Sequence, residues 1–267
     1  MSEILLIKIL FWLTLFFFLF YLMKPRLSHK DAMQEFYAWR YAHRGYHDIK
    51  KGIPENSLQA FQRACEHGYG MELDVQLTRD KQLVVLHDFN LLRACGIEKE
   101  VADLTLEEIK QLRLFGTECA IPTFEEVLQL VNGQTPLIVE IKQKTADCET
   151  CVQAARLLDQ YKGKYCVESF HPMAVRWFKK HRPHYLRGQL SGNLHMKQPA
   201  KFILENLLTN FLARPDFIAY DVEHRNRIAL RICIALYGSP LVYWTIKDKV
   251  LYEEVKDAIV IFEGFEA

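Results

Sequence analysis

The chain of 267 residues is long enough for one large domain or two small ones, at roughly 150 residues per domain. Half of its residues are hydrophobic, a quarter are charged and the mean hydropathy is -0.08, which excludes fibrous, disordered and multi-spanning membrane proteins. With 34 basic and 33 acidic residues the net charge is +1, so no nucleic-acid-sized basic field exists.

The first expected element is a membrane-spanning helix over Ile4–Met23, in which only Lys8 and Thr14 are not apolar or aromatic. Twenty helical residues reach about 30 Å, the thickness of a bilayer's hydrocarbon core. A cleaved signal peptide is the alternative, but the run is longer than a typical signal-peptide core and Tyr21–Lys30 offers no small-x-small cleavage site. We therefore predict a single-pass membrane anchor with a basic flank over residues 1–30.

The orientation follows from the charges on either side of this segment. Lys24, Arg26 and Lys30 follow it, whereas only Lys8 lies near its start, so the positive-inside rule places the body in the cytoplasm. The seven cysteines are odd in number and scattered, which is typical of reduced thiols rather than of a disulfide framework. Both observations favour a cytoplasmic-facing body.

After a linker and lead-in helix over residues 24–39, short β-rich runs alternate with helical stretches. The runs that read as strands are Arg40–Arg44, Gly70–Val75, Leu83–His87, Leu137–Lys142, Tyr165–Phe170, Tyr185–Leu190, Asp216–Val222, Leu241–Ile246 and Ala258–Phe262. The helical segments are Ser57–His67, Thr123–Val131, Cys148–Tyr161, Met173–His181, Phe202–Leu212, Arg227–Leu236 and Lys249–Lys256. This alternation predicts βαβ units around a parallel sheet.

One of the nine strands does not fit a parallel sheet. Only Gln76–Gln82 separates Val75 from Leu83, and a parallel crossover needs a dozen or more residues. We therefore assign Leu83–His87 to a hairpin or an excursion, which leaves eight strands for a TIM-type (β/α)8 barrel over residues 31–267. A doubly wound open sheet is the alternative.

Candidate catalytic side chains lie near the predicted strand ends, where barrels of this type place their active sites. Glu72 and Asp74 are two apart on one strand and share a face, as do Glu140 and Lys142 on the next barrel strand. The three carboxylates form an all-oxygen set that suits one divalent cation, Mg2+ or Ca2+.

Two histidines and two basic side chains complete this set of candidate residues. His43 and His87 can act as general base and general acid near neutral pH. Arg44 and Lys142 can hold an anionic group such as a phosphoryl oxygen. Each residue alone is explained equally well by a structural role or an ion pair, and their convergence at one barrel mouth favours a site.

These residues also carry a resemblance to a known family. Five motifs occur in order over residues 40–142, and two shorter ones follow. They are His43-Arg44-Gly45, Pro54-Glu55-Asn56-Ser57, Glu72-Leu73-Asp74-Val75, Val84-Val85-Leu86-His87-Asp88, Val139-Glu140-Ile141-Lys142, Glu168-Ser169-Phe170 and Tyr243-Trp244-Thr245-Ile246. In this pattern the chain resembles the glycerophosphodiester phosphodiesterase family.

The resemblance implies a TIM-type barrel with a small insertion after the second strand, at about residues 76–117. It implies a divalent cation held by Glu72, Asp74 and Glu140, with His43 and His87 as the acid and base. Glu55 precedes a helix start and has two open interpretations, support of Arg44 or a place in the outer shell of the metal. Phe170 and Trp244 are expected either to form an apolar wall for the glycerol backbone or simply to pack the barrel.

Two positions depart from the family pattern. The family often has Asn after its Trp-Thr pair, where this chain has Lys247. Its last strand often ends in Thr-Asp, where this chain reads Ala258-Ile259-Val260-Ile261-Phe262-Glu263-Gly264-Phe265. Neither change touches a proposed ligand or acid-base residue, so they bear on alcohol specificity.

The expected function is metal-dependent hydrolysis of glycerophosphodiesters to sn-glycerol 3-phosphate and an alcohol such as choline or ethanolamine. Two alternatives stay open at this point: a membrane lysophospholipase D-type phosphodiesterase acting on lysolipids, and a catalytically silent, membrane-tethered binding module. The expected partners are therefore the small-molecule or lysolipid substrate and the membrane, with no nucleic acid. Oligomeric state, the choice of cation and the identity of the base are not determined by the sequence.

Overall fold

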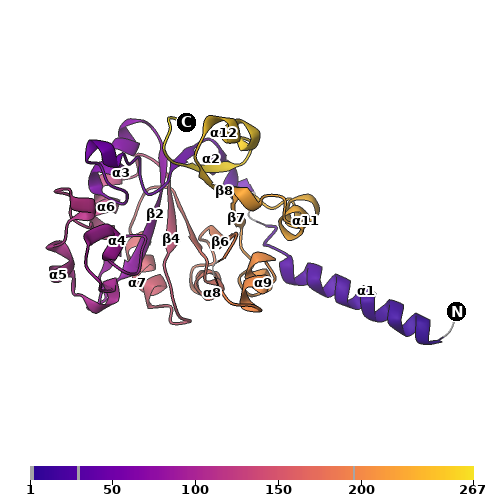
Figure 1. Cartoon of the computed structure of the whole chain (residues 1–267). Coiled ribbons are helices and arrows are strands. Elements are labelled where there is room, and N and C mark those ends of the chain that lie inside the picture. Colours follow the sequence, from indigo (N-terminus) through magenta and orange to yellow (C-terminus); the bar gives the residue numbers. More distant parts are fainter. Residues whose placement is uncertain (1–2, 29–30, 195) are drawn as a thin grey trace.

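The computed structural model describes residues 3–28, 31–194 and 196–267. Over these residues eight parallel strands close into a barrel (Figure 1). In barrel order they are β1 (Arg40–Ala42), β2 (Gly70–Leu77), β4 (Leu137–Ile141), β5 (Tyr165–Ser169), β6 (Arg187–Ser191), β7 (Phe217–Asp221), β8 (Leu241–Ile246) and β9 (Ile259–Phe262). Because β1 pairs with both β2 and β9, the ring is closed. The predicted (β/α)8 barrel is confirmed, and the open-sheet alternative is wrong.

The run Leu83–His87, which was assigned to a hairpin or an excursion, contains a hairpin strand, as predicted. β3 (Leu83–Val85) pairs antiparallel with the end of β2, with Val75 opposite Val85. This pairing extends β2 to Leu77, beyond the predicted end at Val75. Glu72 and Asp74 consequently lie inside β2 rather than at its end, and His87 lies in the loop that follows β3.

Most predicted helices are present within three residues of their expected bounds. They are α3 (Leu58–Glu66), α6 (Phe124–Val131), α7 (Glu149–Leu158), α8 (Pro172–His181), α11 (Ile228–Tyr237) and α12 (Lys249–Val255). The single helix predicted over Phe202–Leu212 is wrong. Leu207 has a φ of 57°, a left-handed conformation that ends a helix, and the segment divides into α9 (Ala200–Glu205) and α10 (Asn210–Ala213).

Short elements fill the remaining connections. They are η1 (Asp31–Met33), α2 (Gln34–Tyr37), η2 (Ile49–Lys51), α4 (Leu92–Cys95), η3 (Val101–Asp103), α5 (Leu106–Lys110), η4 (Leu114–Gly116) and η5 (Val222–His224). Those between β3 and α6 enclose an apolar cluster of their own that includes Leu86, Leu91 and Ile109. This packed excursion occupies the region expected for the insertion, while the predicted domain boundaries remain predictions.

Alternation along the strands separates the core from the site. In β2, Met71, Leu73 and Val75 pack outward into the cluster shared with the helices, and Glu72 and Asp74 alternate with them and point into the barrel. The lower interior of the barrel is filled by a second apolar cluster, to which Tyr41, Ile138, Phe217, Ala219, Val242 and Ile261 belong. The carboxylates therefore lie on top of a packed barrel interior.

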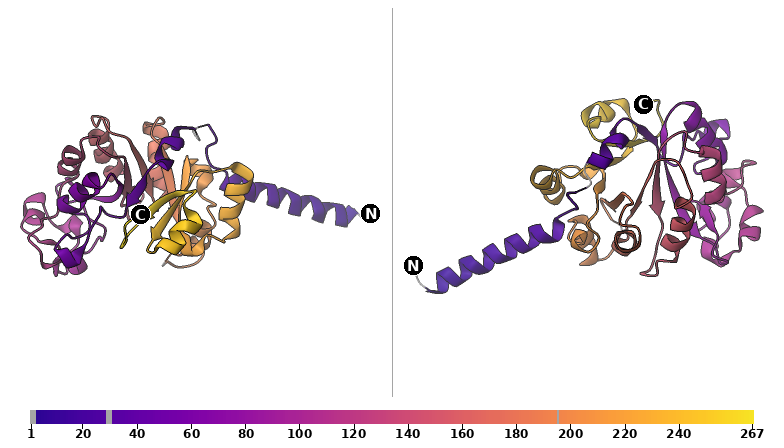
Figure 2. Two further views of the ribbon diagram at one scale, coloured as in Figure 1. Left: turned by 90° about the horizontal axis from the view of Figure 1, so that it is seen from above. Right: turned by 180° about the vertical axis from the view of Figure 1, so that it is seen from behind.

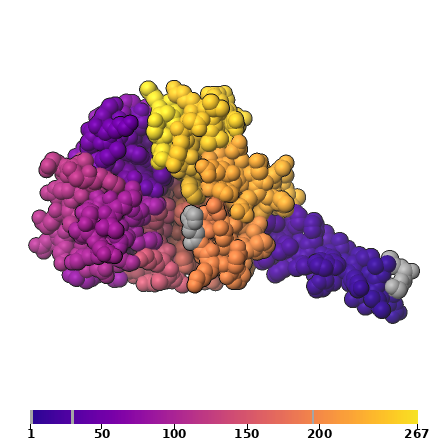
Figure 3. Space-filling model, viewed as in Figure 1, coloured from indigo at the N-terminus to yellow at the C-terminus, as the bar shows by residue number. Residues whose placement is uncertain are grey.

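The N-terminal helix α1 (Glu3–Met23) projects away from the barrel (Figures 1 and 2). In the space-filling view it stands clear of the body and joins it beside the orange segments (Figure 3). Its apolar length is enough to cross a membrane, and its most apolar stretch of 18 residues is not buried in the protein. Signal sequences share these properties. Of the predicted basic flank, Lys30 lies outside the described residues.

Candidate active site

Three buried carboxylates meet at the open end of the barrel. Glu72 and Asp74 come from β2 and Glu140 from β4, where Asp74 and Glu140 are directly paired in register. One carboxylate oxygen from each lies within 4.8 Å of the others. The three residues that were predicted as metal ligands are thus brought together, and they offer oxygen donors only.

The pKa shifts of these three carboxyl groups are those expected where buried negative charges are crowded together, as in a cation site. Burial, followed by repulsion from Asp74 and Glu140, raises the pKa of Glu72 well above its ordinary value, and burial raises the pKa of Glu140 to about 7. Burial would also raise the pKa of Asp74, but Lys142, His87 and Arg44 together lower it. A hard divalent cation would relieve the repulsion among the three groups, so the residues present fit such an ion.

Both basic side chains predicted for the site, Arg44 and Lys142, lie against these carboxylates. The Lys142 Nζ is 3.0 Å from Asp74 Oδ1 and 2.9 Å from Glu140 Oε1. The Arg44 backbone N–H donates to Glu72 Oε2 at 3.1 Å, and its guanidinium Nε lies 3.6 Å from Asp74 Oδ2. The positive charges therefore balance part of the cluster, and their predicted role in holding a phosphoryl group stays a prediction.

Glu55 fixes Arg44 from the other side. Glu55 Oε1 accepts a hydrogen bond from Arg44 Nη1 at 2.7 Å, and both of its oxygens also accept from Arg93. The next residue, Asn56, donates to Asp74 Oδ2 at 2.9 Å. Ser57 caps α3 through its hydroxyl, which accepts the Ala60 backbone N–H. Of the two roles left open for Glu55, these contacts favour support of Arg44.

Each candidate histidine has the same arrangement at its Nδ1 atom. His43 Nδ1 lies 2.5 Å from Glu263 Oε2, and His87 Nδ1 lies 2.6 Å from Asp88 Oδ1. A carboxylate at Nδ1 assigns the proton to that nitrogen and leaves Nε2 as the acceptor. Burial lowers the pKa of both rings. A ring oriented in this way can accept a proton at Nε2 when it is neutral and donate one from Nε2 when it is protonated on both nitrogens.

A cavity of about 650 Å³ joins these groups. Its lining includes both histidines, Arg44, Glu72 and Glu140, and also Phe170 and Trp244, whose ring centroids are 5.5 Å apart in an edge-to-face arrangement. The two aromatic residues thus line the same cavity as the two histidines, and their role as an apolar wall stays a prediction. Among the predicted residues, Asp74 and Lys142 lie behind this lining.

The sequence reasoning missed two carboxylates of the cavity. Glu168 on β5 is buried beside Glu140, with its pKa raised well above the ordinary value by burial and by Glu140. Glu263, after β9, holds His43 and also lies 3.4 Å from Lys247 Nζ through its second oxygen. Lys247 and Glu263 both lie where the sequence departs from the family pattern, and the structure brings them into contact. The sequence showed each departure separately but not the contact between them.

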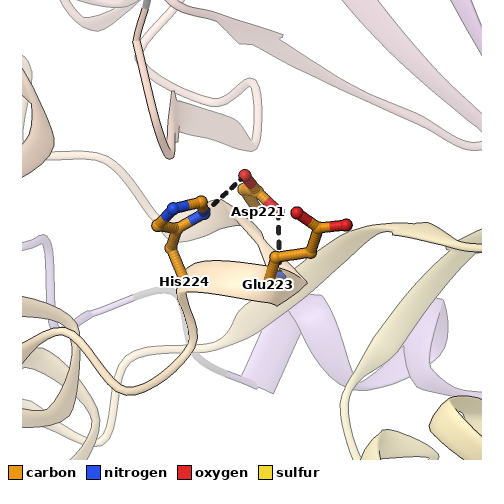
Figure 4. Close-up of side chains that lie close together, drawn as sticks. All are labelled: Asp221, Glu223 and His224. Carbon is orange, nitrogen blue, oxygen red and sulfur yellow. Dashed lines mark hydrogen bonds and ion pairs between the residues drawn. The ribbon is translucent and has the colours of Figure 1, made fainter.

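A second group of possible ligands follows β7 (Figure 4). Asp221 accepts the Glu223 backbone N–H at 3.0 Å through Oδ1 and faces His224 Nδ1 at 2.8 Å through Oδ2. Both oxygens are therefore used within the turn, which is the geometry of an aspartate that starts a short helix. This group organises the rim of the cavity, where Asp221 is a lining residue.

Comparison with known proteins agrees with this geometry. The sequence model described as Glycerophosphoryl diester phosphodiesterase family matches residues 43–259. The chain is 39% identical over 162 residues to a glycerophosphodiester phosphodiesterase of Caldanaerobacter subterraneus, covering 56% of this chain and 65% of that protein. It is 32% identical over 155 residues to a lysophospholipase D of Rattus norvegicus, covering 53% and 47%. The matches span less than two thirds of these relatives.

Solved structures share the barrel over most of its length. A phosphodiesterase of Oleispira antarctica, in complex with the product sn-glycerol-3-phosphate, superposes with a TM-score of 0.69 at 22% identity, covering 84% of this chain and 92% of that one. A glycerophosphodiester phosphodiesterase of Parabacteroides distasonis gives 0.66 at 26% identity, covering 84% and 91%. These likenesses establish the fold independently of the site.

Proposed function

The chain belongs to the glycerophosphoryl diester phosphodiesterase family, and from that premise we propose that it hydrolyses glycerophosphodiesters to sn-glycerol 3-phosphate and an alcohol. One observation carries the proposal. An all-carboxylate cluster and two carboxylate-held histidines line a single cavity, which is the equipment that phosphodiester hydrolysis needs.

The cation site consists of Glu72, Asp74 and Glu140, with Mg2+ or Ca2+ as the proposed ion. When bound, such an ion supplies a Lewis acid for a non-bridging phosphate oxygen and offsets the negative charge of the transition state. Arg44, which is held by Glu55, contributes a fixed positive charge at the same place. Lys142 neutralises two of the ligands and supports that charge balance.

The proton transfers are assigned to His43 and His87. One of them, in its neutral form, accepts a proton from the nucleophile at Nε2, and the other, protonated on both nitrogens, donates its Nε2 proton to the leaving alkoxide. The nucleophile is water or the neighbouring hydroxyl of the glycerol, which would form a cyclic phosphate. Phe170 and Trp244 provide the apolar wall against which the glycerol backbone is proposed to lie.

The test is a metal-dependent assay of the full chain in detergent micelles against a panel of glycerophosphodiesters and lysolipids. EDTA should abolish turnover, and Mg2+ or Ca2+ should restore it. If none of the panel is cleaved with any divalent cation, the enzyme proposal fails and the silent binding module becomes the better description.

The histidines provide a sharper test of the mechanism. His43→Ala and His87→Ala should each lower kcat by about 10² to 10⁴-fold, the usual contribution of acid-base catalysis, while the chain still unfolds in one cooperative transition. Near-normal turnover in either variant would remove that residue from the mechanism. His67→Ala is the matched control, since this histidine is exposed on the barrel's outside, at the end of α3.

A lysolipid substrate is the second candidate, and the apolar helix α1 is the observation that favours it. We propose that residues 1–30 anchor the chain in a membrane with a single span, and that the barrel domain over residues 31–267 faces the cytoplasm. An anchored barrel meets lipids more often than soluble diesters. The ratio of activity on lysophosphatidylcholine to that on glycerophosphocholine decides between the two substrates.

A further inference from the structure

Exposed apolar side chains are concentrated on one side of the barrel. Among the described residues, seven of the eleven large apolar side chains that are exposed outside α1 fall within residues 196–236. Six of them belong to three consecutive helices, and they are Phe202 and Ile203 of α9, Phe211 of α10, and Ile228, Ile234 and Leu236 of α11. Large apolar patches on a protein surface usually mark a contact surface.

The end of α1 is bound to these same helices. The Asn210 side chain donates to the Met23 carbonyl at 2.9 Å, and the Arg214 guanidinium donates to the Tyr21 carbonyl at 3.0 Å. On the other side, the Tyr237 hydroxyl of α11 donates to the Phe20 carbonyl at 2.8 Å. Because its last turn is held by α10 and α11, α1 cannot insert into a bilayer without bringing these helices to the bilayer surface.

The outer face of α11 has the composition expected at such a surface. Ile228 is 77% exposed and Leu236 is 56% exposed, and no other described segment covers them. Arg231 is the only charged residue among the ten residues of α11. Lys197 precedes α9 and Lys201 lies in its first turn, so the apolar side chains are accompanied by positive charge. Apolar side chains beside lysine and arginine are typical of segments that lie in the interface of anionic membranes.

We propose that α9, α10 and α11 form a docking surface for the lipid bilayer in which α1 is anchored. The six apolar residues named above enter the interfacial region, and the basic residues contact anionic head groups. The proposal rests on the single-span anchor of the proposed function and adds a second contact with the membrane, which fixes the orientation of the barrel.

The docking surface is connected to the cavity through the loop between β6 and α9. Asn193 and Leu194 of this loop line the cavity, and the Leu194 backbone N–H donates at 2.8 Å to the buried Glu205 of α9. The Ser191 hydroxyl donates to the Leu204 carbonyl of α9 at 3.0 Å. One rim of the cavity is therefore attached to the surface that meets the bilayer, so a lipid head group would have a short path to it.

Tryptophan quenching in the full chain tests this orientation. The chain is reconstituted into vesicles of phosphatidylcholine and phosphatidylglycerol with brominated acyl chains, where Trp12 of α1 reports insertion. The comparison is between Ile228→Trp and Leu92→Trp, because Leu92 is exposed as well, at 56% against 77% for Ile228, but lies on α4, across the molecule from α1 (Figures 1 and 2). The added emission at position 228 should be quenched by the brominated chains, and that at position 92 should not.

The outcomes separate this proposal from those on which it rests. Equal, unquenched emission from the two added tryptophans, with Trp12 quenched, would overturn the docking surface and leave the anchor intact. If Trp12 is not quenched either, the anchor and the docking surface both fail. Activity on soluble glycerophosphocholine is measured in both variants and should equal that of the parent chain, so a failure of the enzyme proposal is detected independently.

Discussion

Glu263 and His43 are 220 positions apart in the chain, and their contact depends on the closure of the barrel. β9 pairs with β1, which places the residue that follows β9 beside the residue that follows β1. The carboxylate then sets the tautomer of His43 and orients the ring. Glu263 is therefore a positioning residue for the acid-base pair, in the same way that Asp88 is for His87.

Replacement of this carboxylate should impair catalysis without affecting the binding of the substrate. We expect Glu263→Gln to lower kcat on the order of 10²-fold with little change in KM, because a glutamine amide no longer favours the proton on Nδ1. Glu263→Asp should retain part of the activity if the shorter side chain still reaches the ring. Steady-state kinetics on a glycerophosphodiester measures both, and a change confined to KM would contradict the positioning role.

The same residue predicts a dependence of stability on pH. The hydrogen bond with His43 lowers the pKa of Glu263 to about 2 from an ordinary 4.5, despite partial burial. A lowered pKa means that the ionised carboxylate stabilises the fold, so its contribution is complete above pH 4.5 and is lost as the pH falls toward 2. Glu263→Gln should cost on the order of 1 to 3 kcal/mol at pH 7 and progressively less below pH 4.5.

Unfolding curves at pH 7, 5 and 3.5 measure this loss. The difference in free energy of unfolding between the parent chain and Glu263→Gln should be similar at pH 7 and pH 5 and smaller at pH 3.5. Glu98→Gln serves as the control, because Glu98 is exposed in the excursion far from the cavity, and should give the same small difference at every pH. A difference for Glu263→Gln that persists unchanged at pH 3.5 would refute the linkage.

At the scale of elements, the sequence predicted what depends on local periodicity and chain length. Leu83–His87 could be recognised as a hairpin because seven residues cannot form a parallel crossover. The break between α9 and α10 could not be predicted, because nothing in the sequence indicates that a leucine adopts a positive φ. Glu72, Asp74 and Glu140 were found because strand alternation is local, whereas Glu263 and Glu168 required the closed ring.

The pairing of β6 with β7 shows how the interior of the barrel is packed. Gly188 lies opposite Phe217, and a Cβ atom at position 188 would lie 2.1 Å from the Phe217 ring. Gly188→Ala should therefore destabilise the fold by about 1 to 3 kcal/mol, the usual cost of overpacking. Phe217→Leu in the same chain should recover part of this loss, because it makes room for the methyl group. A double-mutant cycle by thermal unfolding measures the recovery, and strictly additive losses would show that the two residues do not compete for space.

On the scale of the whole molecule, the barrel closes over a set of like charges that the fold alone does not neutralise. Glu72, Asp74, Glu140 and Glu168 are buried together, and Arg44 and Lys142 are the cations within their reach. Burial, with repulsion from Asp74 adding to it, raises the pKa of Glu140 to about 7. Ordinary packing would not select such an arrangement, so the cluster is expected to lower the stability of the metal-free protein, and the proposed cation would relieve that cost.

Addition of a divalent cation should therefore raise the melting temperature of the full chain. A ligand that binds only the folded state stabilises it by about 2.7 kcal/mol at a hundred times its Kd, which corresponds to roughly 5 to 10 °C for a barrel of this size. The shift should increase with the concentration of Mg2+ or Ca2+, disappear with EDTA and be absent in Glu72→Gln. Glu223→Gln, which alters the cluster that follows β7, should retain it. This readout is independent of turnover, so a chain that binds the cation and cleaves nothing would still show the shift. A chain that shows no shift with either cation contradicts the carboxylate site itself.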